Sequence, residues 1–435
     1  MFECFFPKYI YIRSSFAVIK LTCASMGLKM ELDRLSSLPD DVTEKILERL
    51  PLKEAVRTSV LSRKWRYKSE MLQTLLFHNN CVSTQSHPTY SFANIVDHVL
   101  LLHKGPIHRF ELSFNGKLAT RDIDRWIFHL SRNPVVEQMI LDNFEGDIYN
   151  IPSCLFSFQD IVYLELYRCL LNPPSTFKGF GSLKSLDLWS VTLAQHVFDN
   201  LIGCSPVLEI LKLQRCDGFT NLKIDAPKLW FIYIIGAFED FNLVGSSNLV
   251  DASFDLQVIV DQRGNCTSFG NLLKFFDHQL PHIRRLTIKR NFLKYLSIGA
   301  LPEKLPKPCQ YLNFLSLDMS FDNPDEISTV LCLLRGSPAL KEPKILVDPE
   351  KDHAAVGEVG SCLYDNYNCA YTQLRFVEIT KISGVKAQLD FIESLLLSSP
   401  VLERMTVQPA SVDGFLKLVK DLLLFKRAEI MVLDP

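Results

Sequence analysis

Residues 204–216 read CSPVLEILKLQRC. Within them, Pro206, Leu208, Leu211 and Leu213 follow one spacing: proline, one residue, apolar, two residues, apolar, one residue, apolar. The last two apolar positions alternate with polar ones, which is typical of a strand with one buried face. The proline ends any preceding helix because it has no N–H and biases its predecessor towards extended geometry. The stretch therefore predicts a helix stop followed by a short strand.

The same spacing recurs along most of the chain, with successive copies mostly about 20 to 34 residues apart, which is the period of a leucine-rich repeat. Copies that keep the proline begin at Pro134, Pro206, Pro227, Pro281 and Pro400. Copies without the proline centre on Phe110, Leu164, Leu186, Leu315 and Val377. One further copy begins at Pro338, but Pro343 takes its central apolar position, so we expect that copy to be damaged.

Apolar runs typical of helices precede several of these copies, at residues 126–130, 197–202, 272–276, 330–334 and 391–397. The repeating unit is therefore a helix, a stop and a short strand. Stacked units of this kind place parallel strands on one face and helices on the other, curved into a solenoid. Residues 222–254 have no helical run and are expected to form loops or short turns outside the strands. A doubly wound α/β sheet is the alternative architecture.

Residues 35–66, LSSLPDDVTEKILERLPLKEAVRTSVLSRKWR, read as a group of short helices. Pro39 before two aspartates suits a first helical turn, because proline has the right φ and acids favour the positive end of the helix dipole. Pro51 ends that helix and permits a second, and a third short helix is expected around Trp65. A unit this small buries too little surface to fold alone, so its apolar residues need a partner.

These residues resemble the F-box. The match rests on Leu38-Pro39, Ile46-Leu47, Leu50-Pro51 and the run from residue 55 to residue 66. The resemblance implies docking on the Skp adaptor, and through it on the cullin, of a ubiquitin ligase. The residues that it assigns to adaptor contact are Leu38, Pro39, Ile46, Leu50, Pro51, Leu52, Val56, Val60 and Trp65.

The residues around Trp65 leave alternatives open. F-box proteins often continue with a Leu-Trp pair after this tryptophan, whereas this chain has Tyr67-Lys68-Ser69-Glu70. The alternatives are a vestigial F-box that recruits no ligase, or a helical hairpin that packs on the chain's own core. The basic run between Arg57 and Lys68 is compatible with a localisation signal or a nucleic-acid contact, but a solvated face or a rim contact to an acidic adaptor is favoured.

The C-terminal stretch 374–408, with residues 428–430, resembles the FBD segment that closes plant F-box/FBD/LRR proteins. It predicts a helix at 387–397, a strand at 402–407 and a final helix at 413–425. A terminal cap covers the apolar end that a solenoid otherwise exposes. The chain is therefore identified as a member of the plant F-box/FBD/LRR-repeat family. The implied fold is α/β: a three-helix F-box, a leucine-rich-repeat solenoid with its strands on the concave face and helices or loops outside, and an FBD cap.

The expected organisation is an N-terminal extension at 1–30, the F-box at 31–77, the repeat region at 91–359 and the FBD domain at 360–435. The extension is interpreted either as upstream of a working start at Met26 or Met30, or as disordered. A signal or transit peptide is the alternative, but Pro7 and several charged residues interrupt each apolar run. No stretch reaches the ~18–20 apolar residues of a membrane-spanning helix.

Composition indicates an ordinary globular protein, with 47% hydrophobic and 22% charged residues. The net charge of −2 creates no field that would attract nucleic acid or an anionic membrane. The 12 cysteines are scattered, which is typical of reduced thiols in the cytoplasm or nucleus. Cys216 stands where leucine-rich repeats favour asparagine or cysteine and is expected to be a buried packing thiol.

No catalytic constellation is evident. The chain has no Gly-x-Ser-x-Gly elbow, no phosphate-binding glycine loop and no Cys-x-x-Cys. His278 and His282 are four residues apart, but Pro281 forbids the continuous helix that a metal-binding pair needs. We therefore expect no catalytic residue, no cofactor and no metal. The protein is not expected to be an enzyme.

Two function hypotheses follow. The first is a substrate-recognition subunit of a Skp–cullin–F-box ubiquitin ligase, whose repeats hold an unknown target protein on the concave face. The candidate target-contact residues are Glu165, Lys184, Lys212 and Lys289. The second is a leucine-rich-repeat scaffold with a vestigial F-box. An enzyme is a distant third.

Overall fold

The structure is a computed structural model that describes residues 37–81, 88–143, 147–245, 247–258, 272, 275–276, 280–298, 305, 307–348, 371–411 and 429–433. Its main feature is a 14-stranded parallel sheet whose strand order follows the chain. The strands are β1 (Thr74–His78), β2 (Arg109–Phe114), β3 (Gln138–Asn143), β5 (Tyr163–Tyr167), β7 (Ser185–Trp189), β9 (Ile210–Gln214), β11 (Phe231–Phe238), β13 (Asp251–Val258), β14 (Arg285–Ile288), β15 (Phe314–Met319), β16 (Glu342–Val347), β17 (Phe376–Ile382), β18 (Arg404–Pro409) and β19 (Glu429–Val432).

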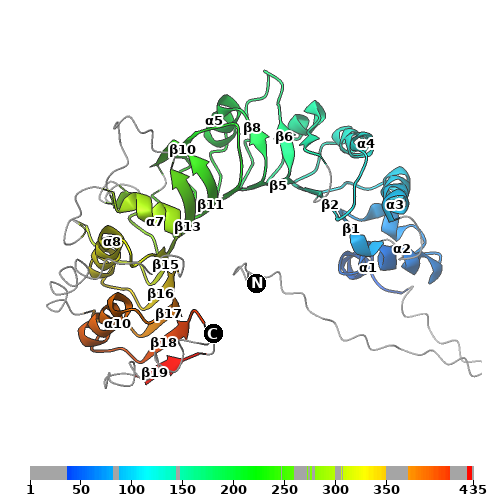
Figure 1. Ribbon diagram of the computed structural model, residues 1–435. Helices are drawn as coiled ribbons and strands as arrows, with labels where there is room; N and C mark the ends of the chain where they lie inside the picture. The colour runs from blue at the N-terminus through cyan, green and yellow to red at the C-terminus, as the bar shows by residue number, and fades with distance from the viewer. Residues whose placement is uncertain are drawn as a thin grey trace, which may run out of the picture.

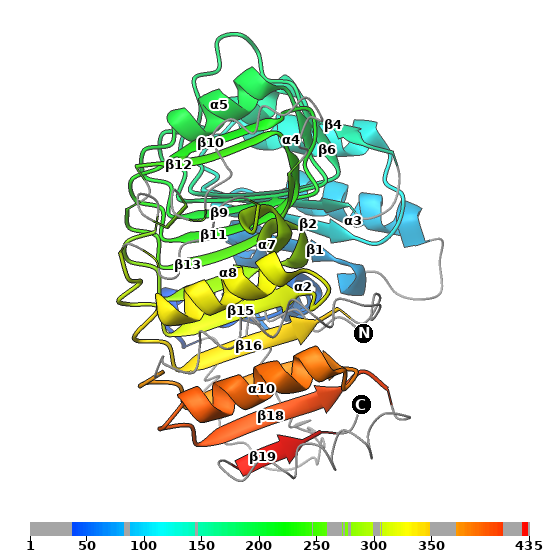
Figure 2. The ribbon, with the colours of Figure 1, turned by 60° about the vertical axis from the view of Figure 1, so that its left-hand side comes forward.

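The sheet bends into an arc with its strands on the inner, concave side and the helices outside (Figure 1). The outer helices are α3 (Pro88–Leu102), α4 (Thr120–Ser131), α5 (Gln195–Gly203), α7 (Arg290–Leu296), α8 (Pro324–Arg335) and α10 (Lys386–Ser398). Adjacent strands are about 4.8 Å apart, whereas a helix is about 10 Å wide, so a helical outer layer must be longer than the strand layer. Figure 2 shows α8 and α10 beside strands that run in one direction. The predicted α/β solenoid is confirmed, and the doubly wound alternative is wrong because the helices cover one face only.

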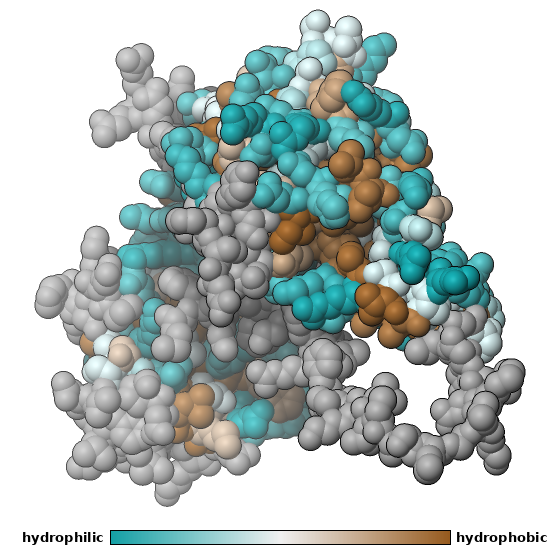
Figure 3. Space-filling view, turned by 90° about the vertical axis from the view of Figure 1, so that its right-hand side faces the viewer, coloured by the Kyte–Doolittle hydropathy of each residue, from teal (hydrophilic) through white to brown (hydrophobic). Residues whose placement is uncertain are grey.

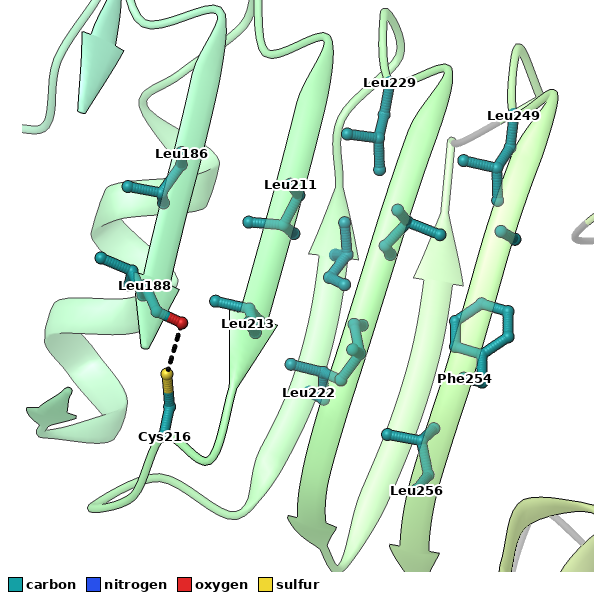
Figure 4. Close-up of a cluster of buried hydrophobic side chains, with 14 of the residues drawn as sticks. Leu186, Leu188, Leu211, Leu213, Cys216, Leu222, Leu229, Leu249, Phe254 and Leu256 are labelled. Carbon is teal, nitrogen blue, oxygen red and sulfur yellow. Dashed lines mark hydrogen bonds between the residues drawn. The ribbon is translucent and has the colours of Figure 1, made fainter. Parts of the chain in front are cut away.

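The core consists of two continuous rows of side chains that point from the sheet towards the helices. In one row Leu186 lies beside Leu211, which lies beside Ile232 on the next strand. In the second row Leu188, Leu213 and Ile234 are paired in the same way, and all six side chains are fully buried. These are the last two apolar positions of the repeated spacing, as Figure 4 shows for β7 and β9.

The structure contains two copies of the repeat that were not predicted from the sequence. The first copy has Leu72 before β1 and Leu75 and Phe77 within it. The second has Leu249 in the turn before β13 and Ala252 and Phe254 within that strand. Both follow the same spacing, but phenylalanine or alanine replaces a leucine. Because β1 pairs with β2, the sheet begins at Thr74, inside the segment assigned above to the F-box.

The copy predicted to be damaged at Pro343 still forms a strand, but its pairing with the following strand is shortened. Pro343 lies within β16, is buried, and pairs with Leu315 of β15. The pairing of β16 with β17 begins only at Lys344, one residue later, because proline has no N–H to donate to its neighbour. A hollow of about 330 Å³ lies at this point on the sheet, lined by Glu342, Pro343, Lys344, Phe376, Val377, Glu378, Arg404 and Thr406.

The outer layer differs from the expectation at residues 222–254. There β10 (Asn221–Asp225) and β12 (Asp240–Val244) form a small parallel sheet instead of loops or short turns. A second outer ladder joins β4 (Tyr149–Asn150), β6 (Cys169–Leu171) and β8 (Thr192–Leu193). Short strands therefore replace helices over part of the outer side.

The N-terminal end of the arc consists of helices α1 (Asp40–Glu48) and α2 (Leu52–Arg57) and the short 3-10 helices η1 (Thr58–Val60) and η2 (Lys68–Met71). Pro39 and Pro51 stand immediately before α1 and α2, as the sequence predicted. The expected helix around Trp65 is absent, because Trp65 lies in a turn between η1 and η2.

At the C-terminal end, β17, α10 and β18 match the strand, helix and strand predicted for the FBD-like segment. The predicted final helix at 413–425 lies outside the described residues.

Replacing Leu213 by alanine should lower the free energy of unfolding by about 2–5 kcal/mol, because it leaves a cavity between two paired strands. Chemical denaturation followed by circular dichroism measures this loss. Leu170→Ala on the exposed position of β6 is the control and should cost well under half as much. Equal losses for both variants would contradict the assignment of the core rows.

Cys216 should resist alkylation in the folded protein. Its thiol donates a hydrogen bond to the carbonyl oxygen of Leu188 at 3.4 Å (Figure 4), and burial raises its pKa to about 12, which leaves little thiolate. Exposed Cys204 is the internal control. Because Lys212 and Arg215 separate the two cysteines, trypsin places them on different peptides, and mass spectrometry after iodoacetamide treatment should find only the Cys204 peptide modified. Similar modification of both before unfolding would contradict the prediction.

Candidate functional site

The helical segment, residues 38–71, is held in shape by its own hydrogen bonds and ion pairs. Two aspartates stand in the first turn of α1, and the hydroxyl of buried Thr43 donates to the carbonyl oxygen of Pro39 at 3.0 Å. The ammonium group of Lys68 lies 3.3 Å from a carboxylate oxygen of Asp40 and 3.6 Å from one of Glu44. These contacts join the end of the segment back to its first helix.

One side of the helical segment is part of the solenoid core. Leu47, Leu52, Ala55 and Trp65 are buried in the same apolar cluster as Leu75 of β1. Trp65 is only 2% exposed and Leu52 only 7%. The alternative in which the hairpin packs on the chain's own core therefore holds for this side.

The other side of the helical segment exposes apolar side chains. Val60 is 85% exposed, Leu61 52% and Val56 43%. Tyr67 and Met71 are also more than two-fifths exposed. These five residues are called the apolar face, and Figure 3 shows apolar side chains among hydrophilic ones at this end of the molecule. A cluster of exposed apolar residues on a soluble domain typically marks a protein-binding surface.

The structure divides the nine residues predicted to contact an adaptor. Val56, Val60, Pro39 and Pro51 are exposed, whereas Leu38, Ile46 and Leu50 are half-buried and Leu52 and Trp65 are inside the chain. Adaptor contact at these positions stays a prediction. Leu61 and Met71 were not predicted from the sequence. The available signal was that each is an apolar residue in a segment too small to bury all of its apolar side chains, and Leu61 directly follows Val60.

The residues where the match to the F-box pattern fades, 67–70, fix the helical segment to the chain that follows α3. The ammonium of Lys104 lies 2.7 Å from a carboxylate oxygen of Glu70 and 5.4 Å from the centre of the Tyr67 ring. The backbone N–H of Lys104 also donates to the carbonyl oxygen of Glu70 at 2.9 Å. A Cβ on Gly105 would come within 3.0 Å of the Met71 backbone, so glycine permits this close approach.

The basic run of the helical segment is partly neutralised from within. Lys64 lies 3.4 Å from Asp40, and Arg57 lies 2.8 Å from Glu54. Hydrogen bonding from Lys68, with the charges of Lys68 and Lys64, lowers the pKa of Asp40. This pairing favours a solvated face or a rim contact over a nucleic-acid surface.

The concave face carries the side chains that alternate with the buried rows. Glu165 and Lys212 lie on this face in the middle of β5 and β9. Lys184 lies just before β7 and Lys289 just after β14, so these two candidates stand at opposite edges of the face. Each has an acidic neighbour: Lys184 is 3.7 Å from Glu209, and Lys289 is 3.2 Å from Asp318.

Acidic residues that the sequence reading did not select also lie on the concave face. Burial, with the charges of Glu165 and Glu111, raises the pKa of Asp142 to about 7, although a hydrogen bond from Ser113 acts in the opposite direction. Burial likewise raises the pKa values of Glu165 and Asp187. The alternating pattern predicted which side of each strand faces inward, but the burial of a carboxylate depends on neighbouring strands and leaves no local signal.

The histidine pair considered for metal binding is not tested, because His278 lies outside the described residues. Among the residues that the structure describes, no three histidine, cysteine, aspartate or glutamate side chains are grouped as a metal site would require. None of the described helices has the length and apolar character needed to cross a membrane.

Two family models match the chain. The F-box domain model matches residues 35–75, and the model described as At1g61320/AtMIF1, LRR domain, matches residues 99–415. Neither model describes an enzyme.

Several curated relatives match over nearly their whole length. The chain is similar to the F-box/FBD/LRR-repeat protein At1g13570 of Arabidopsis thaliana, with 38% identity over 92% of this chain and 99% of the relative. It is also similar to the putative FBD-associated F-box protein At5g50270 of the same plant, with 26% identity over 88% of this chain and 98% of the relative. The helical segment, the parallel repeat sheet and these matches agree: the chain belongs to the plant F-box/FBD/LRR-repeat protein family.

Proposed function

We propose that this protein is the substrate-recognition subunit of a Skp–cullin–F-box ubiquitin ligase in the cytoplasm or nucleus. F-box domains generally bind Skp-type adaptors, and the helical segment matches the F-box model. The observation that carries the proposal is that this segment has both buried and exposed apolar residues. Its inner side is part of the solenoid core, while Val56, Val60 and Leu61 are 43%, 85% and 52% exposed.

In this proposal the exposed and buried residues have different roles. Val56 and Val60, together with Leu61, contact the adaptor and lose their exposed apolar surface on binding, which is favourable. Leu52 and Trp65, which are buried in this chain, also hold the segment in position from inside. Tyr67 supplies an exposed aromatic ring where many F-box proteins have a Leu-Trp pair.

The repeat surface would hold the target, and the cullin bound through the adaptor would bring the ubiquitin-charged enzyme. This arrangement raises the effective concentration of a target lysine near that enzyme. It needs no bond-making or bond-breaking residue in this chain, so we propose a non-catalytic subunit without a cofactor. The repeat scaffold with a vestigial F-box is the competing function.

Val60→Asp should weaken binding to a purified Skp adaptor by at least about tenfold, because it places a charge in an interface that must lose water. Isothermal titration calorimetry measures the affinity. Val401→Asp is the matched control: Val401 is 44% exposed, lies in the turn before β18, and should retain full affinity. Both variants should keep the circular dichroism spectrum of the native chain. An unchanged affinity of Val60→Asp would remove the apolar face from the adaptor interface.

The vestigial alternative is tested on the intact chain by co-purification with a Skp adaptor. The ligase proposal expects the native chain to retain the adaptor. If the native chain fails, while a Tyr67→Leu, Lys68→Trp variant retains it, the vestigial alternative is correct. Lys68 also bonds Asp40 and Glu44, so the variant's thermal unfolding is measured beside that of native protein.

A further inference from the structure

The charges on the concave face are distributed unevenly along the arc. In the half from β13 onwards, most acids on this face have a basic partner on the next strand. Arg285 lies 3.5 Å from Asp251, and Lys344 lies 2.5 Å from Glu378. This half is therefore close to neutral by pairing within the chain.

The half nearer the helical segment has more acids than bases at its centre. Glu165 of β5 is directly in register with Asp187 of β7, and Asp142 lies on β3 two residues beyond Ile140, the register partner of Glu165. Lys212 of β9 lies 2.9 Å from one oxygen of Asp187. Like charges on neighbouring strands repel each other, so one lysine leaves this group short of positive charge.

Lys212 pairs with one oxygen of Asp187, and the other oxygen of this carboxylate is a separate observation. Asp187 is only 4% exposed, yet its second carboxylate oxygen is buried and has no hydrogen-bond partner among the described residues. One oxygen of Asp142 is also buried without a hydrogen-bond partner among the described residues. Its other oxygen accepts a hydrogen bond from Ser113 at 3.2 Å. Buried carboxylate oxygens without a donor are costly, and a cation with N–H donors would satisfy them.

Aromatic rings border these carboxylates. Tyr163 and Tyr167 flank Glu165 on β5, and the hydroxyl of Tyr163 donates to its carboxylate. The Tyr167 ring lies 5.3 Å from the ring of Trp189, centre to centre, on the neighbouring strand. Faces of tyrosine and tryptophan attract guanidinium and ammonium groups, which adds to the attraction of the carboxylates.

We propose that Asp142, Glu165 and Asp187, with Tyr163, Tyr167 and Trp189, form an acid–aromatic surface that binds an arginine- or lysine-bearing segment of a partner protein. The occupant follows from charge complementarity and from the open concave sheet, which has room for an extended segment. Steering between opposite charges would also favour its association. The inference rests on the target-binding part of the proposed function and specifies the partner's chemistry.

The first test uses a labelled synthetic peptide of alternating arginine and glycine, with a glutamate–glycine peptide as its control. Fluorescence anisotropy at low salt should show binding of the arginine peptide only. The isosteric double variant Asp142→Asn, Glu165→Gln should bind it at least about tenfold more weakly. The matched control Glu378→Gln removes one paired charge from the other half and should stay within about twofold of native affinity.

The second test locates the peptide. Trp189 and Trp230 are two of the four tryptophans, and Trp230 lies before β11, outside the acid–aromatic surface. The peptide should change tryptophan emission in native protein and in Trp230→Phe but not in Trp189→Phe. Circular dichroism of each variant verifies its fold.

Three outcomes would overturn the proposal: equal binding of both peptides, equal weakening by Glu378→Gln, or a response to spermine without one to the arginine peptide. The last outcome would identify a small polycation as the ligand. The Val60→Asp variant separates this inference from the proposed ligase role, because it should lose the adaptor while retaining the peptide.

Discussion

The structure depends on the register between neighbouring strands, which aligns the two inward side chains of each repeat with those of the next. Leu188, Leu213 and Ile234 show this alignment at the centre of the arc, where each covers the flank of the next. Because a helix is wider than the spacing of two strands, the same stacking that buries these rows also bends the sheet. Curvature, the outer position of the helices and the polar concave face therefore have one cause.

The sequence predicted the solenoid because the repeated spacing records this register many times. It failed where a single residue departed from the pattern and its neighbours maintained the strand. Ala252 is small and Pro343 cannot donate a hydrogen bond, yet each lies between strands that hold it in line. Trp65 is the opposite case: its surroundings predicted a helix, but its burial in the apolar core is achieved by a turn.

The functional surfaces were only partly predictable for a related reason. The spacing of Leu52 and Val56 places them on one side of α2, yet Leu52 is buried and Val56 is 43% exposed. The difference depends on packing against other parts of the chain, which the local sequence pattern does not contain. On the concave face, alternation identified Glu165 and Lys212, whereas Asp142 and Asp187 stand out only when the charges of neighbouring strands are compared.

The shared burial of Trp65 with the first strands has a geometric consequence. No linker separates the helical segment from the sheet, so a protein bound at either place is held at a fixed angle and distance from one bound at the other. The spacing between the helical segment and the concave face is therefore set by the folded repeats and not by a linker. Inserting or deleting one repeat would turn the concave face to a new direction relative to the helical segment.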